Sequence, residues 1–142
     1  MSTRQFWGTW RLQSFEVRTS GEDVSYPYGR DAKGYLTYTQ DGYMAVSVMK
    51  ALRANFDSSD MLSASFDEKR SAFDSFASYC GTYEVRENKI IHHVQLSLFP
   101  NWSGSDQERF FKFSADRLVL STPMAAGVTA IVVWRRVQLT QN

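Results

Sequence analysis

The two histidines of the chain, His92 and His93, are adjacent in a segment that alternates apolar and polar side chains. Histidine changes its charge near neutral pH, so either residue could transfer a proton or orient a polar ligand. In a strand the two side chains point to opposite faces. His93 would face the interior only if that interior were a polar pocket. We expect His92 to face inward, because its side of the strand is the more apolar one and includes Ile90, Val94, Leu96 and Leu98. The plainer interpretation of this histidine is a half-buried side chain with one hydrogen bond.

The sequence predicts no metal ion and no cofactor. Two histidines on opposite faces of a strand cannot share an ion, and no cluster of cysteine and carboxylate residues has ligand spacing. The glycines fit turns rather than a phosphate-binding loop, and no Gly-x-Ser-x-Gly motif is present. The single cysteine, Cys80, is expected to be an inert buried thiol on the apolar side of a helix.

A second candidate group lies on one face of a later strand, formed by Gln107, Arg109 and Phe111. We expect this face to point inward, because the opposite face would bury Lys112. An arginine inside a barrel needs a carboxylate partner or an anionic ligand, since an unpaired buried charge is costly. Glu84 is the candidate partner.

Aromatic residues supply the remaining candidate site. Tyr38 and Tyr43 flank the Asp41-Gly42 turn and either line a pocket or stabilise the sheet through cross-strand contacts. Trp102, in a Pro-Asn-Trp corner, either plugs the mouth of a barrel or contacts a ligand.

The elements that must position these residues are mostly strands. Residues 65–80 predict one helix, with a capping box at Ser65 and Glu68 and a C-terminal cap at Gly81. The long loop 19–34 is unusually apolar at Tyr26-Pro27-Tyr28, so we expect it to pack against the domain. Period-two alternation and turn signals predict about eight strands, at 7–18, 35–40, 43–50, 82–87, 89–99, 106–113, 116–122 and 128–137.

This pattern predicts an all-β fold: an up-and-down antiparallel barrel with one inserted helix near residues 65–80. The chain of 142 residues fits a single domain spanning 1–142. The net charge of +1 gives no reason to expect a nucleic-acid partner. One cysteine, no signal peptide and no apolar run of membrane-spanning length favour a cytoplasmic protein without membrane contact.

Two sets of residues carry a family resemblance. Gly8-Thr9-Trp10 is similar to the Gly-x-Trp signature of lipocalins and related calycin barrels, in which the tryptophan closes one end and packs on an arginine of the last strand. That arginine would be Arg135 or Arg136. Longer runs resemble the bacterial and fungal lipocalin-like domain family: Tyr26-Pro27-Tyr28-Gly29, the stretch Asp31 to Met44, Gly81 to Val85, His92-His93-Val94, Ser97 to Trp102, and Asp116-Arg117-Leu118. The resemblance implies a calycin-type barrel and, because some members accompany natural-product pathways, hints at aromatic or polyketide-like ligands.

Three functions follow as hypotheses. The first is binding of a small apolar or aromatic molecule in a barrel partly covered by residues 51–80, with His92 and Arg109 at its polar end. The second is a cofactor-independent isomerase, cyclase or hydratase for a polyketide-like or terpenoid substrate, with the histidine as acid or base. In the third, side chains fill the barrel interior and the protein acts through its outer surface, for example as a homodimer. Its contact would be an outward row on the last strand, either Val128, Ala130, Val132 and Trp134 or the alternate row of that strand.

Overall fold

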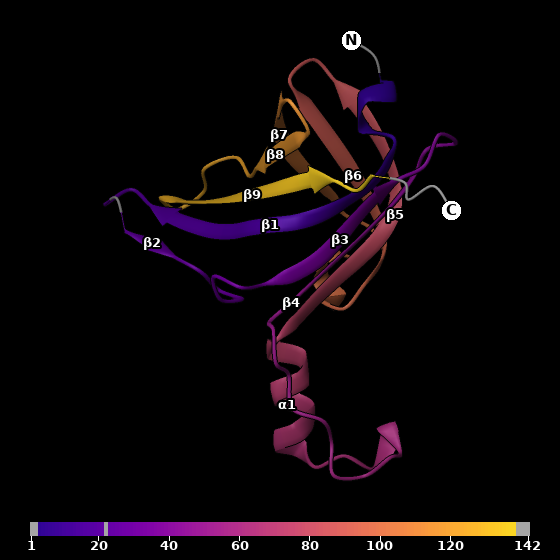
Figure 1. Ribbon diagram of the computed structural model, residues 1–142, viewed down its shortest axis with the longest axis vertical. Coiled ribbons are helices and arrows are strands. Elements are labelled where there is room, and N and C mark those ends of the chain that lie inside the picture. The colour runs from indigo at the N-terminus through magenta and orange to yellow at the C-terminus, as the bar shows by residue number, and fades with distance from the viewer. Residues whose placement is uncertain (1–2, 22, 139–142) are drawn as a thin grey trace.

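The computed structural model describes residues 3–21 and 23–138 and contains one antiparallel sheet that closes on itself. Strands follow one another in sequence order, and the last pairs with the first (Figure 1). Only the two-residue β2 lies outside the ring, as an edge beside β1. The bounds are β1 Gly8–Thr19, β2 Val24–Ser25, β3 Lys33–Tyr38, β4 Tyr43–Met49, β5 Phe76–Arg86, β6 Lys89–Ser97, β7 Asp106–Ser114, β8 Arg117–Ser121 and β9 Val128–Arg136. The predicted up-and-down barrel with a helix insertion is confirmed.

One end of the barrel is closed by a cluster of aromatic side chains around Phe6 and Trp10, which we name the aromatic plug, and by the guanidinium group of Arg136. The short 3-10 helix η1, Thr3–Phe6, brings Phe6 into the core, where it is fully buried. Trp10 Nε1 donates a hydrogen bond to the Phe6 carbonyl at 2.9 Å. The Arg136 guanidinium lies 4.1 Å from the centre of the Trp10 ring and donates to the carbonyls of Trp7 and Gln5. The arginine that the resemblance implied is therefore Arg136.

The helix is shorter than predicted. α1 spans Phe66–Asp74, and residues 76–80 belong to β5, where they pair with β4. The capping box of Ser65 and Glu68 is present, but Gly81 lies inside a strand rather than at a helix end. From Phe76 onward the backbone forms its hydrogen bonds with the neighbouring strands β4 and β6. This sheet pairing overrides the helical spacing of the apolar residues. Cys80 accordingly lies half-buried on a strand.

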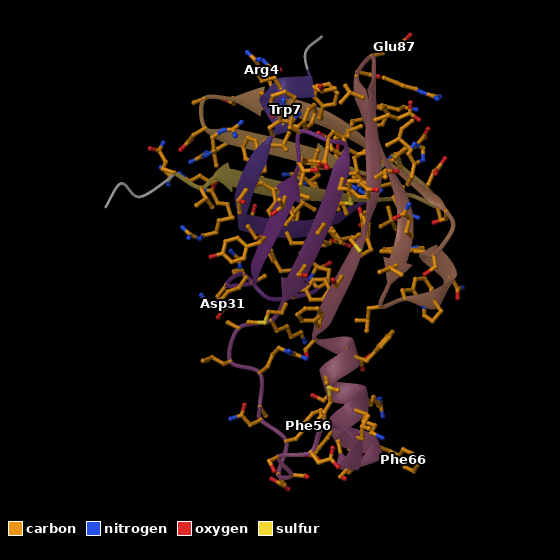
Figure 2. All side chains as sticks on the ribbon, turned by 90° about the vertical axis from the view of Figure 1, so that its right-hand side faces the viewer. Arg4, Trp7, Asp31, Phe56, Phe66 and Glu87 are labelled. Carbon is orange, nitrogen blue, oxygen red and sulfur yellow. The ribbon has the colours of Figure 1, made fainter. Side chains whose placement is uncertain are left out.

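Residues 50–75, which we name the arm, connect β4 to β5 and contain α1. Figure 1 shows the arm projecting away from the ends of these strands instead of covering the barrel. Figure 2 places its Phe56 and Phe66 at the opposite end of the molecule from Trp7. Phe66 is 91% exposed, so the predicted apolar stripe of the helix is not buried against the domain.

Two β-bulges change which side chains face inward. The register of β1 against β9 shifts between Leu12 and Ser14, so that Phe15 turns inward opposite Val132. The register of β5 against β6 shifts at Cys80 and Gly81, which turns Leu96 outward. A bulge inserts one residue and thereby reverses the alternation beyond it. The expectation that Leu96 and Leu98 share the inner face of His92 is wrong for this reason, because they are 69% and 38% exposed.

Candidate ligand site in the barrel interior

A cavity of about 120 Å³ lies inside the barrel, between the aromatic plug and the end from which the arm projects. Most of its lining is aliphatic or aromatic and includes Phe15, Val46, Val48, Leu120 and Val132. This lining suits an apolar ligand with few polar groups.

The described residues of the arm contribute nothing to this cavity. The only part of 51–80 that reaches it is β5, through Ala77, Ser78 and Tyr79, which form a wall. The expectation that residues 51–80 partly cover the barrel is therefore wrong for the described arm. Of the row that the third hypothesis offers as an outward contact, Ala130, Val132 and Trp134 instead line the cavity, and Val128 is 40% exposed.

His92 lies at the centre of a buried hydrogen-bond network. It is 2% exposed and lines the cavity, as the apolar character of its face predicts. Its Nε2 lies 2.6 Å from the hydroxyl of Tyr38, and its Nδ1 lies 2.7 Å from the hydroxyl of Tyr79. Burial, together with the nearby Arg109 charge, lowers the pKa of His92 to about 3. The imidazole is therefore neutral at neutral pH, and both ring nitrogens have a tyrosine partner.

Burial also raises the pKa of Tyr38 well above its ordinary value and raises the pKa of Tyr79. Both phenols consequently keep their protons and act as neutral hydroxyl groups. Tyr38 belongs to the core below the cavity, where its ring packs edge-on against Phe6 and Tyr83. Tyr79 lines the cavity itself. The network thus connects the closed core to the ligand space.

Arg109 brings a positive charge to the cavity wall, on the inner face of β7 as expected. Its Nη1 donates to the main-chain carbonyl of Glu108 at 2.8 Å. Within the described ranges, no carboxylate forms a salt bridge with its guanidinium. The predicted pairing with Glu84 is wrong, because Glu84 faces outward and bonds to Arg86 and His93.

Trp134 is 2% exposed and lines the cavity from β9. Its indole Nε1 is buried and has no hydrogen-bond partner, the sole such side-chain atom in the part of the chain that the structure describes. Buried polar groups in proteins are nearly always paired, so an unpaired one calls for an explanation.

The rim contains two partly exposed aromatic residues from outside the barrel strands. Tyr28, in the loop before β3, packs edge-on against Phe15 at 5.3 Å, so this loop packs on the domain as predicted. Burial raises the pKa of its hydroxyl. Trp102, in the 3-10 helix η3 Pro100–Trp102, packs edge-on against Tyr79 at 5.8 Å and lines the cavity.

His93 and its neighbours lie outside the barrel. Its Nδ1 is 2.6 Å from Asp106 and its Nε2 is 2.8 Å from Glu84. Asp106, followed by Glu84, raises the pKa of this histidine. Tyr43 is also on the outside and 53% exposed. These positions separate His93, Glu84 and Tyr43 from the cavity.

Two further predicted residues face inward without reaching the cavity. Gln107 Nε2 donates to Ser105 Oγ at 3.1 Å. Phe111 belongs to the aromatic plug, where its ring lies 4.9 Å from Phe6. Of the nine predicted site residues, the structure brings His92, Arg109 and Trp102 to the cavity. Tyr38 lies behind them, in hydrogen-bond contact with His92.

Sequence reasoning missed Phe15, Tyr79 and Trp134, which all line the cavity. Phe15 is turned inward by a bulge that alternation does not reveal. Tyr79 was placed in the helix, although the alternation of small and aromatic residues from Ala77 to Tyr83 fits a strand. For Trp134 the alternation of the last strand leaves both faces open, so the sequence does not identify it as a lining residue.

Among the described residues, no group of three or more histidine, cysteine or acidic side chains is arranged to hold a metal ion. Within the same ranges, no helix has the length and apolar character needed to cross a membrane.

Comparison with known proteins agrees with this architecture. A relative in Aspergillus oryzae, the 4'-hydroxy-3'-methoxypropiophenone carrier protein ppsC, is 27% identical over an alignment of 106 residues, and the match covers 66% of this chain and 96% of that protein. A solved lipocalin-like protein from Bacteroides uniformis shares the fold with a TM-score of 0.50 at 11% identity, over 93% of this chain and 98% of the other. The family model described as the lipocalin-like domain matches residues 7–137. The chain therefore belongs to the lipocalin-like domain family.

Proposed function

We propose that the protein binds a small aromatic molecule inside its barrel and carries it without chemical change. The observation that carries this proposal is the interior cavity, which has apolar walls and a few polar side chains at fixed positions. Such a lining is typical of small-molecule sites.

The size of the cavity limits the occupant. An apolar cavity of about 150 Å³ is large enough to hold benzene, and this one measures about 120 Å³. The volume therefore limits the occupant to about one aromatic ring, and a short substituent requires small shifts of Tyr28 and Trp102 at the rim. The name of the Aspergillus relative specifies a propiophenone, which is a single ring with a ketone side chain, and this supports the same class.

The alternative function, acid–base catalysis by His92, receives less support. An effective general base has a pKa near the working pH, whereas burial lowers the pKa of His92 to about 3. Both ring nitrogens are also engaged by Tyr38 and Tyr79. A neutral imidazole held in this way orients its neighbours rather than exchanging protons with a substrate.

The proposal is tested by isothermal titration calorimetry with acetophenone, benzoate and octanoate on the wild-type protein. We expect saturable one-site binding of at least one single-ring probe. Ala130→Leu, which places a larger side chain into the cavity, should abolish this binding while the fold persists by circular dichroism. Ala77→Leu fills the same space from β5 and serves as the second variant. Phe66→Ala on the arm is the control and should bind as wild type.

Absence of binding by every probe at millimolar concentration would contradict the proposal. Unchanged affinity in folded Ala130→Leu or Ala77→Leu would also contradict it, because binding would then occur elsewhere.

A further inference from the structure

We infer that the ligand presents oxygen acceptors, such as a ketone, ether or carboxylate oxygen, to a cavity whose free polar groups are hydrogen-bond donors. The inference rests on the proposed function and adds the chemical class of the ligand. It follows from the hydrogen-bond partners of polar side chains that line the cavity.

The first donor is Tyr79. A neutral imidazole carries one N–H and one acceptor nitrogen. It therefore accepts from one tyrosine and donates to the other, and the second tyrosine retains a hydroxyl hydrogen for another partner. If Tyr38 were that residue, its hydroxyl hydrogen would be unpaired in the closed core, and a buried donor without a partner is unfavourable. The favoured arrangement has Tyr38 donating to Nε2 and Nδ1–H donating to Tyr79, whose own O–H can point into the cavity.

The second donor is the indole N–H of Trp134. Trp134 is a lining residue of the cavity, and its indole nitrogen is buried and has no partner among the described residues. An indole nitrogen can only donate. Its partner in this inference is therefore an acceptor atom of the ligand.

The third donor is the guanidinium of Arg109. It forms one hydrogen bond, to the Glu108 carbonyl, and no salt bridge with any carboxylate that the structure describes. A guanidinium has five N–H donors and no acceptor. Its remaining donors and its charge favour a carboxylate or another electron-rich oxygen.

The other polar side chains of the lining do not supply a competing set of acceptors. The hydroxyl of Ser78 lies 3.1 Å from that of Ser47. Thr129 donates to the Thr122 carbonyl, so the Thr122 hydroxyl donates to Thr129 and accepts from the Ala130 N–H. The hydroxyl of Tyr28, at the rim, can donate as well as accept. The cavity is therefore rich in donors and poor in free acceptors.

The test compares ligands of similar size by calorimetry: acetophenone and benzoate, which offer acceptor oxygens; ethylbenzene, which offers none; and benzylamine, which is a cationic donor. We expect acetophenone and benzoate to bind at least tenfold more tightly than ethylbenzene, and benzylamine to bind more weakly than ethylbenzene. A tenfold difference corresponds to about 1.4 kcal/mol, within the range of one hydrogen bond made in a buried site.

Variants assign the effect to residues. Tyr79→Phe and Trp134→Phe should each lower the affinity for acetophenone at least fivefold and change the affinity for ethylbenzene less than twofold. Arg109→Met should lower the affinity for benzoate at least tenfold and the affinity for acetophenone by a smaller factor. Matched controls outside the cavity, Tyr43→Phe, Trp7→Phe and Lys112→Met, should bind all probes as wild type. Where Trp134→Phe fails to fold, Tyr79→Phe and the wild-type ligand series decide the question.

The outcomes are distinguishable. Equal or tighter binding of ethylbenzene relative to acetophenone and benzoate would overturn the donor inference and leave the proposed binding function intact. Tight binding of benzylamine would overturn it in the same way. Failure of every probe to bind would instead remove the proposed function and the inference with it.

Discussion

The hydroxyl of Tyr79 lies 2.7 Å from Nδ1 of His92, at the boundary between the closed core and the cavity. On the other side of the ring, the Tyr38 hydroxyl lies 2.6 Å from Nε2. Because the imidazole is buried and neutral, it donates to one of these tyrosines and accepts from the other. The direction inferred above leaves the hydroxyl hydrogen of Tyr79 as a donor toward the cavity. A histidine that sequence reasoning offers as an acid or base is thereby better suited to orienting a tyrosine.

His92 makes the protein less stable in mild acid. Its pKa falls from 6.5 in the unfolded chain to about 3 in the folded protein, so below pH 6.5 only the unfolded state takes up this proton. The free energy of unfolding then falls as pH falls, by up to about 1.4 kcal/mol per pH unit between 6.5 and 3. Urea unfolding between pH 6.5 and 5, above the range of most carboxylates, measures this slope.

His92→Gln removes the titrating group and should flatten the slope between pH 6.5 and 5. His93→Gln is the matched control and should keep it. An unchanged slope in folded His92→Gln would contradict the buried neutral histidine.

His93 has the opposite effect in another pH range. Asp106 and Glu84 raise its pKa above 6.5 in the folded state. The stability that His93 contributes is therefore fully present below pH 6.5 and is lost as the pH rises through the pKa that His93 has in the folded protein. We expect the wild-type free energy of unfolding to decline above pH 6.5 and that of His93→Gln to decline less. The same urea series at pH 6.5 to 8 measures this, and a steeper decline in His93→Gln would contradict it.

The two tyrosines that contact His92 should differ in their importance for stability. Tyr38→Phe leaves a ring nitrogen unpaired in the closed core, so it should lower the free energy of unfolding by about 1–3 kcal/mol. Tyr79→Phe leaves the Nδ1–H of His92 facing the cavity, where a water molecule can accept its hydrogen bond. This variant should therefore lower the free energy of unfolding by less. Urea unfolding at pH 7 compares the two variants. A larger loss for Tyr79→Phe would reverse the assigned direction of the network.

Arg136 should stabilise the closed end far more than its neighbour Arg135 does. Arg136 stacks on Trp10 and donates to two main-chain carbonyls, at 2.7 and 2.6 Å. Arg135 forms a surface salt bridge with Asp116. We expect Arg136→Met to lower the free energy of unfolding by about 2–4 kcal/mol and Arg135→Met by less than about 1 kcal/mol. Equal losses in chemical denaturation would contradict the role of Arg136.

Much of the fold could be predicted because local signals agree with the sheet pairing. Asp41-Gly42 predicts the turn between β3 and β4, and the alternation around His92 predicts which histidine is buried. Prediction failed where long-range pairing decides the conformation. Residues 76–80 are compatible with helical spacing but pair with β4, and Phe15 turns inward only because a bulge interrupts β1.

The candidate site was predictable to a smaller extent for the same reason. His92 and Arg109 are polar residues on otherwise apolar strand faces, which makes them recognisable. Tyr79 and Trp134 resemble ordinary core residues in the sequence. In our inference, their importance depends on a hydroxyl hydrogen of Tyr79 that His92 does not engage and on the unpaired indole nitrogen of Trp134. Both follow from the three-dimensional arrangement and not from the sequence.

The most direct test of the binding site is a set of intermolecular nuclear Overhauser effects between acetophenone and the methyl groups of the protein. The account predicts contacts from the aromatic ring to Val46, Val48, Leu120 and Val132, which line the cavity. Contacts instead to Leu52, Met61 and Leu62, the exposed apolar residues of the arm, would place the ligand outside the barrel and contradict the account.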